Sequence, residues 1–212
     1  MKKTKLRCPF IVFEGCDGAG KSLAISNTYR LLGDMGIDCI TTREPGGTPA
    51  SEEIREVLKH GVGNDVFGEK STLTGMFTTR FHLHDTLIKP SVDKGDVVLC
   101  DRFAGSSYAY QAYGNKNLIP LFDSLMDVGE FIPQFTIFLD VSYEESCNRM
   151  DGRGEEMDEI EKRNSGEDKF NNLRNGIKEY LKFYQPYSHA IIDTTNLSEA
   201  QVADKIMDII LQ

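Results

Sequence analysis

The segment Phe10-Ile-Val-Phe-Glu-Gly-Cys-Asp-Gly-Ala-Gly-Lys-Ser22 decides the fold of this chain. Its glycines, lysine and serine match the phosphate-loop pattern G-x-x-x-x-G-K-[ST]. An apolar run precedes the loop and an amphipathic run follows it, so we expect a strand, a loop and a helix in that order. In such a loop, backbone N–H groups point inward at an anion and the following helix adds its positive end.

Two side chains of this loop have specific expected contacts. Lys21 can reach the outer phosphates of a nucleotide, and the hydroxyl of Ser22 can hold Mg²⁺. A glycine-rich turn that binds nothing is the alternative, and the flanking strand and helix disfavour it. The expected nucleotide-binding residues are Gly15, Cys16, Asp17, Gly18, Ala19, Gly20, Lys21 and Ser22.

Composition limits the classes of protein to which the chain can belong. Its 212 residues fit one domain, and 40% hydrophobic with 27% charged residues is ordinary for a globular protein with a core. The net charge of −9 disfavours a general nucleic-acid surface. No apolar run approaches the roughly 18 residues that cross a bilayer, so we expect no membrane partner. A small anionic substrate therefore requires basic residues gathered locally.

The start of the chain disfavours secretion, and the cysteines favour a reducing compartment. The basic start leads directly into the first strand and does not resemble a secretion signal. The five cysteines are odd in number, widely spaced and without a C-x-x-C pair. Free thiols are therefore expected, and a cysteine metal site is not.

Strand and helix patterns alternate about five times, with no linker and no internal repeat. This order predicts an α/β fold with a single parallel sheet and helices on both faces, in one domain spanning 1–212. Later strands are expected at 38–42, 96–101, 135–140 and 189–193. Helices are expected at about 71–92, 104–112, 118–128 and 169–184, with a final helix after the last strand.

Charged residues follow two of these strands at the ligand side of the sheet. Asp101 ends a buried strand and Arg102 follows it, which suits Mg²⁺ or its waters and a phosphate, respectively. Asp140 ends another strand without a neighbouring arginine, so a structural role is expected. Arg43 begins the loop Arg43-Glu-Pro-Gly-Gly-Thr48, where an anion contact and a solvated charge remain equal alternatives.

Polar side chains on two helices suit a second ligand. Arg80 lies on an otherwise apolar stripe, which requires either a carboxylate partner inside the fold or a ligand. Ser107 and Gln111 are four residues apart and share a helix face, with Tyr110 at its edge. A hydroxyl and an amide suit the polar edge of a nucleobase, and an ordinary polar helix surface is the alternative.

The stretch from Asp151 to Asp168 is unlike the rest of the chain, with three glycines and 11 charged residues among 18. It is either a solvated charge run or a lid, roughly 149–168, that closes on phosphates. In the second case Arg149 or Arg153 would be brought to the transferring group.

Three segments together resemble the thymidylate kinase family, over essentially the whole chain. They are Phe10–Ser22, Thr42-Arg-Glu-Pro-Gly-Gly-Thr48 and Asp101-Arg-Phe-Ala-Gly-Ser-Ser-Tyr-Ala-Tyr-Gln111. The resemblance implies a P-loop NTPase fold, phosphoryl transfer from ATP to dTMP with Mg²⁺, and a role in dTTP synthesis. It also implies a homodimer in the cytoplasm.

The resemblance also assigns roles to residues. Asp17 would face the nucleoside monophosphate, and Arg43 and Arg102 would surround its phosphate. Tyr110 would disfavour a ribose 2′-hydroxyl. The residues expected at the thymine edge are Arg80, Ser107 and Gln111. The expected catalytic residues are Lys21, Arg102, Arg153 and Asp17, and Ser22 and Asp101 are the expected metal contacts.

Three positions depart from the family pattern, and a fourth, Gly18, distinguishes two branches of the family. Gly18 stands where one branch has a catalytic arginine, so the chain resembles the bacterial type, in which lid arginines such as Arg149 and Arg153 take that duty. Met76 replaces the usual base-stacking phenylalanine and Phe77 follows it, so both are candidate base contacts. Gly105 replaces a common aspartate, and Glu159 replaces a lid arginine.

Two other functions remain possible from the sequence. A deoxynucleoside kinase would act on an unphosphorylated acceptor, but the paired arginines Arg43 and Arg102 favour a phosphorylated one. A nucleotide-dependent switch would bind ATP or GTP without transfer. Asn115-Lys116-Asn117-Leu118 lacks the aspartate of a guanine-reading N-K-x-D pattern, which disfavours a GTPase.

Overall fold

The computed structural model describes residues 8–129, 132–151 and 166–211. Its centre is a five-stranded parallel sheet in the order β2-β3-β1-β4-β5. The strands are β1 (Phe10–Glu14), β2 (Cys39–Arg43), β3 (Val97–Asp101), β4 (Phe135–Asp140) and β5 (His189–Asp193). The expected fold class, a parallel sheet with helices around it, is confirmed.

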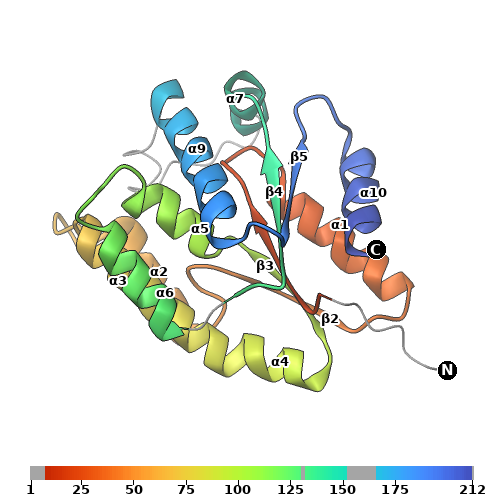
Figure 1. Cartoon of the computed structure of the whole chain (residues 1–212), viewed down its shortest axis with the longest axis horizontal. Helices are drawn as coiled ribbons and strands as arrows, with labels where there is room; N and C mark the ends of the chain where they lie inside the picture. Colours follow the sequence, from red (N-terminus) through yellow and green to blue (C-terminus); the bar gives the residue numbers. More distant parts are fainter. Residues whose placement is uncertain (1–7, 130–131, 152–165, 212) are drawn as a thin grey trace.

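Helices cover both faces of this sheet (Figure 1). On one side lie α1 (Lys21–Asp34) and α10 (Glu199–Ile210). On the other lie α3 (Glu69–Leu83), α6 (Ile119–Gly129) and α9 (Glu167–Tyr184). All residues of β1 are buried, as expected for the central strand of a parallel sheet whose two faces are covered.

Two predicted helices contain a π-helical turn. The helix expected at 71–92 runs as α3, a π turn η1 (His84–Ile88) and α4 (Lys89–Lys94). The helix expected at 104–112 is α5 (Ala104–Ser107) followed by a π turn η2 (Tyr108–Ala112). Such turns insert one extra residue per turn, often at functional sites, and so shift which side chains share a face.

Local sequence fixes where the remaining helices begin. Thr48 caps α2 (Pro49–His60), since its hydroxyl accepts a hydrogen bond from the N–H of Ser51 at 3.2 Å, and Pro49 occupies the first helical position. α7 (Tyr143–Asp151) follows β4 directly. Among the described helices, none is both long enough and apolar enough to cross a bilayer.

An aromatic cluster fixes η2 against α3, α6 and α9. Tyr108 contacts Phe122, Tyr180 and Tyr184, with ring centroids 5.2, 6.1 and 5.5 Å away, and Phe77 contacts Phe122 at 5.6 Å. These rings are buried or nearly so and hold the helical segment that carries Ser107 and Gln111. The five cysteines are free thiols, as expected.

Candidate active site

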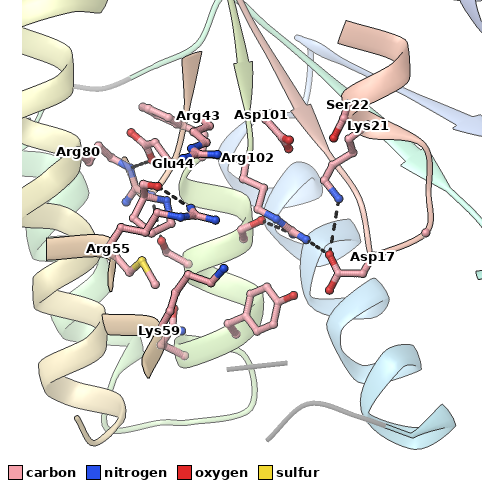
Figure 2. Close-up of a pocket in the computed structure, with 18 of the residues that line it drawn as sticks. Asp17, Lys21, Ser22, Arg43, Glu44, Arg55, Lys59, Arg80, Asp101 and Arg102 are labelled. Carbon is pink, nitrogen blue, oxygen red and sulfur yellow. Dashed lines mark hydrogen bonds and ion pairs between the residues drawn. The ribbon is translucent and has the colours of Figure 1, made fainter. Parts of the chain in front are cut away.

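A cavity of about 360 Å³ lies at the carboxyl ends of β1, β2 and β3. The loops after these three strands, together with α2, α3, α5 and η2, supply its walls. In a parallel sheet, the loops after the strands open on the same edge, which is where ligands bind in this fold class. Figure 2 shows the side chains that converge there, and we call this cavity the pocket.

Lys21 is held inside the phosphate loop. Its side chain is buried, and its ammonium donates to the carbonyl oxygens of Gly15 and Cys16, at 3.1 Å each. The carboxylate of Asp17 lies 3.9 Å away. Burial and the nearby charge of Arg102 hold the pKa of Lys21 below its ordinary value. An anion bound here would therefore meet a desolvated cation.

Arg102 has an unusual backbone conformation. Its φ is 65°, in the left-handed region that residues other than glycine rarely adopt, and its N–H donates to the carbonyl of Phe13 at 2.9 Å. Its guanidinium donates to the carbonyl of Gly15 at 3.1 Å and also bonds the carboxylate of Asp17. The local strain thus places the guanidinium beside the phosphate loop.

Asp17 keeps its charge in this setting. Burial opposes its ionisation, but the charges of Arg102, Lys21 and Lys59 hold its pKa below the usual range. Asp17 is therefore an anion at the junction of the phosphate loop and the arginine.

The buried carboxylate of Glu14 holds the loop after β3. It accepts hydrogen bonds from the N–H groups of Phe103 and Ser106, at 2.9 and 3.0 Å, and from the hydroxyl of Ser106 at 2.6 Å. A Cβ at Gly105 would lie 2.9 Å from this carboxylate and 3.0 Å from the ring of Tyr180. The glycine at this position therefore fits its surroundings, whereas an aspartate would meet a like charge at close range.

Asp101 and Ser22 were expected to hold Mg²⁺, and both line the pocket. The Oδ1 atom of Asp101 is buried and has no hydrogen-bond partner, which leaves a carboxylate oxygen available for a cation. A carboxylate, a hydroxyl and the phosphates of a nucleotide form the oxygen donor set that Mg²⁺ takes, together with waters. No cluster of three His, Cys, Asp or Glu side chains occurs in the described residues, and such a nucleotide site does not need one.

Arg80 has the carboxylate partner that was one of its two expected alternatives. It is 1% exposed, and it donates to Glu44 at 2.7 Å and to the hydroxyl of Ser107 at 2.9 Å. Its guanidinium also lies 4.4 Å from the ring centre of Phe77. However, its Nη1 atom is buried without a partner, as is Oε1 of Gln111. Arg80 therefore has a donor, and Gln111 an acceptor, that is available to a ligand in the pocket.

The structure separates the two candidate base contacts. Met76 lines the pocket, whereas Phe77 does not. Phe77 is fully buried and packs against Phe122 and beneath the guanidinium of Arg80. The expectation for Phe77 is therefore corrected, because neighbouring residues on a helix point about 100° apart and only one of them faces the pocket. Tyr110 lines the pocket as expected, 5.7 Å from the Arg102 guanidinium.

Helix α2 supplies two cations that the sequence did not reveal, Arg55 and Lys59. They are four residues apart and so share a face. Arg55 donates to the carbonyl of Pro45 at 2.6 Å, and Arg43, at the end of β2, pairs with Glu52 at 2.9 Å. The i,i+4 spacing directly after the Arg43–Thr48 loop was the available signal, but it is also typical of a solvated helix face.

The pocket is positively charged in an acidic protein. Its described lining includes six lysine and arginine side chains but only three carboxylates, against a net charge of −9 for the chain. The cations come from the phosphate loop, the ends of β2 and β3, α2 and α3. This arrangement can hold two anions next to each other.

Arg149, the first of the two predicted lid arginines, contacts the phosphate loop. Its guanidinium donates to the carbonyl of Gly18 at 3.3 Å and to that of Thr194 at 2.8 Å. Gly18 has a φ of 74°, and a Cβ there would lie 2.7 Å from the carbonyl oxygen of Ser146 in α7. An arginine at position 18 would therefore not fit, which agrees with the glycine found there. Arg153, Glu159 and most of the predicted lid lie outside the described residues.

Comparison with known proteins agrees with these features. A sequence model of the family described as thymidylate kinase matches residues 13–206. The chain is 39% identical over 159 residues to the thymidylate kinase of Alkalilimnicola ehrlichii, covering 74% of this chain and 73% of that one. It is 40% identical over 158 residues to the thymidylate kinase of Glaesserella parasuis, covering 74% and 75%.

A solved structure extends the likeness to three dimensions. The crystal structure of thymidylate kinase from Ehrlichia chaffeensis superposes with a TM-score of 0.71 at 27% identity, covering 96% of this chain and 98% of that one. With a family match over most of its length, a phosphate loop after β1 and arginines gathered opposite it, the chain belongs to the thymidylate kinase family.

Proposed function

We propose that this chain transfers the γ-phosphoryl group of ATP to dTMP, giving ADP and dTDP on the route to dTTP. The observation that carries the proposal is that two sets of anion-binding groups share one pocket. The phosphate loop and Lys21 form the first set, and Arg43 and Arg102 form the second. A triphosphate and a monophosphate can be held head to head between them.

Catalysis in this arrangement consists mainly of positioning and charge neutralisation. The acceptor phosphate is already nucleophilic, so no strong general base is required. Lys21 and the loop amides orient the donor, while Arg102, anchored by Asp17 and Gly15, orients the acceptor. Ser22 and Asp101 would hold Mg²⁺, which would supply positive charge for the phosphate oxygens.

Recognition of the base is assigned to the other end of the pocket. The unpartnered Nη1 of Arg80 and Oε1 of Gln111 present a donor and an acceptor to the polar edge of thymine. Ser107 fixes Arg80, and Met76 lies against the base in place of an aromatic ring. The ring of Tyr110 disfavours a ribose 2′-hydroxyl.

Closure, assembly and location complete the proposal. Arg149 and Arg153 are the candidates for the arginine that neutralises the transferring group, and the contacts of Arg149 with Gly18 support its place at the donor. The family likeness supports a homodimer in the cytoplasm, and the five free thiols suit a reducing compartment. Sedimentation velocity of the purified chain tests this assembly. We expect a species with twice the mass of one chain.

A coupled assay of ADP formation tests the reaction, with ATP, Mg²⁺ and one acceptor at a time. We expect turnover with dTMP, much less with dUMP or dCMP, none with thymidine, and loss of activity on chelation of Mg²⁺. Turnover of thymidine in preference to dTMP would identify a deoxynucleoside kinase instead. Binding of ATP without transfer to any monophosphate would identify a nucleotide-dependent switch.

A further inference from the structure

The position of Lys59 indicates a role that the family likeness does not assign. Lys59 and Arg55 are one turn apart on the same face of α2, and both line the pocket. Figure 2 shows both on one side of the pocket, with Asp17 of the phosphate loop on the opposite side. The side chain of Lys59 therefore belongs to the ligand-facing surface of α2.

The charge of Lys59 acts across the pocket. It is one of the positive charges that lower the pKa of Asp17. Lys59 therefore acts on a group of the phosphate loop from the α2 side of the pocket. Arg80 and Gln111, each with one unpartnered polar atom, mark the part of the pocket assigned to the base.

Three arginines that line the pocket are held by protein groups. Arg43 pairs with Glu52, Arg55 bonds the carbonyl of Pro45, and Arg102 pairs with Asp17. A lysine differs from them in having a compact charge on a flexible stem with three rotatable donors. It can therefore follow a phosphate oxygen that fixed guanidinium groups do not reach.

We propose that Lys59 is a substrate-contacting residue whose ammonium binds the 5′-phosphate of the acceptor nucleotide from the α2 side of the pocket. It acts as a third cation beside Arg43 and Arg102. The inference rests on the proposed function, since it requires a phosphorylated acceptor in this pocket. It leaves the donor site and the thymine contacts unchanged.

The test compares an acceptor with a phosphate and one without it. The Michaelis constant for dTMP and the inhibition constant of thymidine against dTMP are measured for the wild type and for Lys59→Met, which keeps the stem and removes the charge. We expect the Michaelis constant for dTMP to rise about tenfold in Lys59→Met, because a charge-assisted hydrogen bond contributes at least that much to affinity. The thymidine constant and the Michaelis constant for ATP should stay within twofold.

Two further variants complete the design. Lys59→Arg keeps the cation and should restore most of the dTMP affinity, whereas Lys70→Met removes an exposed lysine of α3 outside the pocket and should behave as wild type. An unchanged dTMP constant in Lys59→Met overturns the proposal. Equal rises for dTMP and thymidine also overturn it, because they place Lys59 on the nucleoside or in the fold. A wild type that does not phosphorylate dTMP refutes the proposed function instead.

Discussion

Five charged side chains of the pocket are bonded to one another without a ligand. Asp17 joins Lys21 and Arg102, and Glu44 joins Arg80. Such bonds fix rotamers in advance, which lowers the entropy cost of binding a nucleotide in one geometry. Single substitutions can therefore test the charge, the position and the protonation of these side chains separately.

Lys21→Ala should reduce phosphoryl transfer to background. The alanine removes a buried cation that two loop carbonyls orient, so the donor phosphates lose their only lysine in the phosphate loop. Steady-state assays with dTMP and ATP measure the effect, and thermal unfolding of the variant shows that it is folded. Near-normal turnover would refute the donor-site assignment.

Glu44 should make folding stability depend on pH. Burial raises the pKa of Glu44 from 4.5 to about 7, although the neighbouring Arg80 opposes this shift. The folded state therefore holds this proton more tightly than the unfolded state, and the contribution to stability falls as pH rises from about 4.5 to 7. Urea unfolding between pH 5 and 8 measures this dependence.

Glu44→Gln is the matched variant for this prediction, since it keeps the shape and removes the titration. We expect the decline in stability over this pH range to be smaller in Glu44→Gln than in the wild type. Identical declines in the two proteins would show that Glu44 does not titrate in this window.

At the scale of elements, the strands were predicted better than the side chains that face the pocket. Each predicted strand lies within one residue of its observed position, because buried apolar runs bounded by polar residues are a strong local signal. The π turns at η1 and η2 were missed, since one extra residue in a helix leaves no mark in a short apolar pattern.

The site shows the same division between local and tertiary information. Motif residues such as Lys21, Arg43 and Arg102 were predicted and do line the pocket. Lys59 was missed, because a charge on an amphipathic helix is ordinarily solvated and only the packing of α2 shows otherwise. The choice between Met76 and Phe77 likewise required the orientation of α3.

Two glycines test how closely α7 and the phosphate loop approach each other. Gly18→Ala adds a Cβ 2.7 Å from the backbone of Ser146 at a φ of 74°, so we expect it to destabilise the protein by about 1–3 kcal/mol. It should also weaken ATP binding. Gly33→Ala, in α1, meets no atom within 4 Å and should stabilise by about 0.5–1 kcal/mol.

Urea unfolding of both variants, with the Michaelis constant for ATP, provides the comparison. If Gly18→Ala proved as stable as Gly33→Ala, the contact between α7 and the phosphate loop would not be as close as the structure has it.

At the scale of the whole molecule, ligand binding is linked to global stability because the phosphate loop, which lines the pocket, also contacts α7 from the second half of the chain. Arg149 connects α7 with the phosphate loop and the loop after β5, and Asp140 at the end of β4 bonds Arg174 and Lys178 of α9. A nucleotide that binds the folded protein and not the unfolded chain therefore stabilises the sheet and the helices together.

Saturating dTMP should raise the melting temperature more than thymidine does at the same concentration. A ligand at 100 times its dissociation constant contributes about 2.7 kcal/mol, or roughly 5–10 °C for a chain of this size. Differential scanning fluorimetry measures both shifts, with a nucleotide-free sample as reference. Equal shifts for the two ligands would mean that the acceptor phosphate adds nothing to binding.

The excess of cations in the pocket acts on departure as well as on arrival. Because dTDP carries one more negative charge than dTMP, the field that draws the substrate in holds the product back more strongly. Rising ionic strength should therefore relieve product inhibition by dTDP more steeply than it raises the Michaelis constant for dTMP. At high ionic strength, product release would then be fastest, while the affinity for dTMP would be lowest.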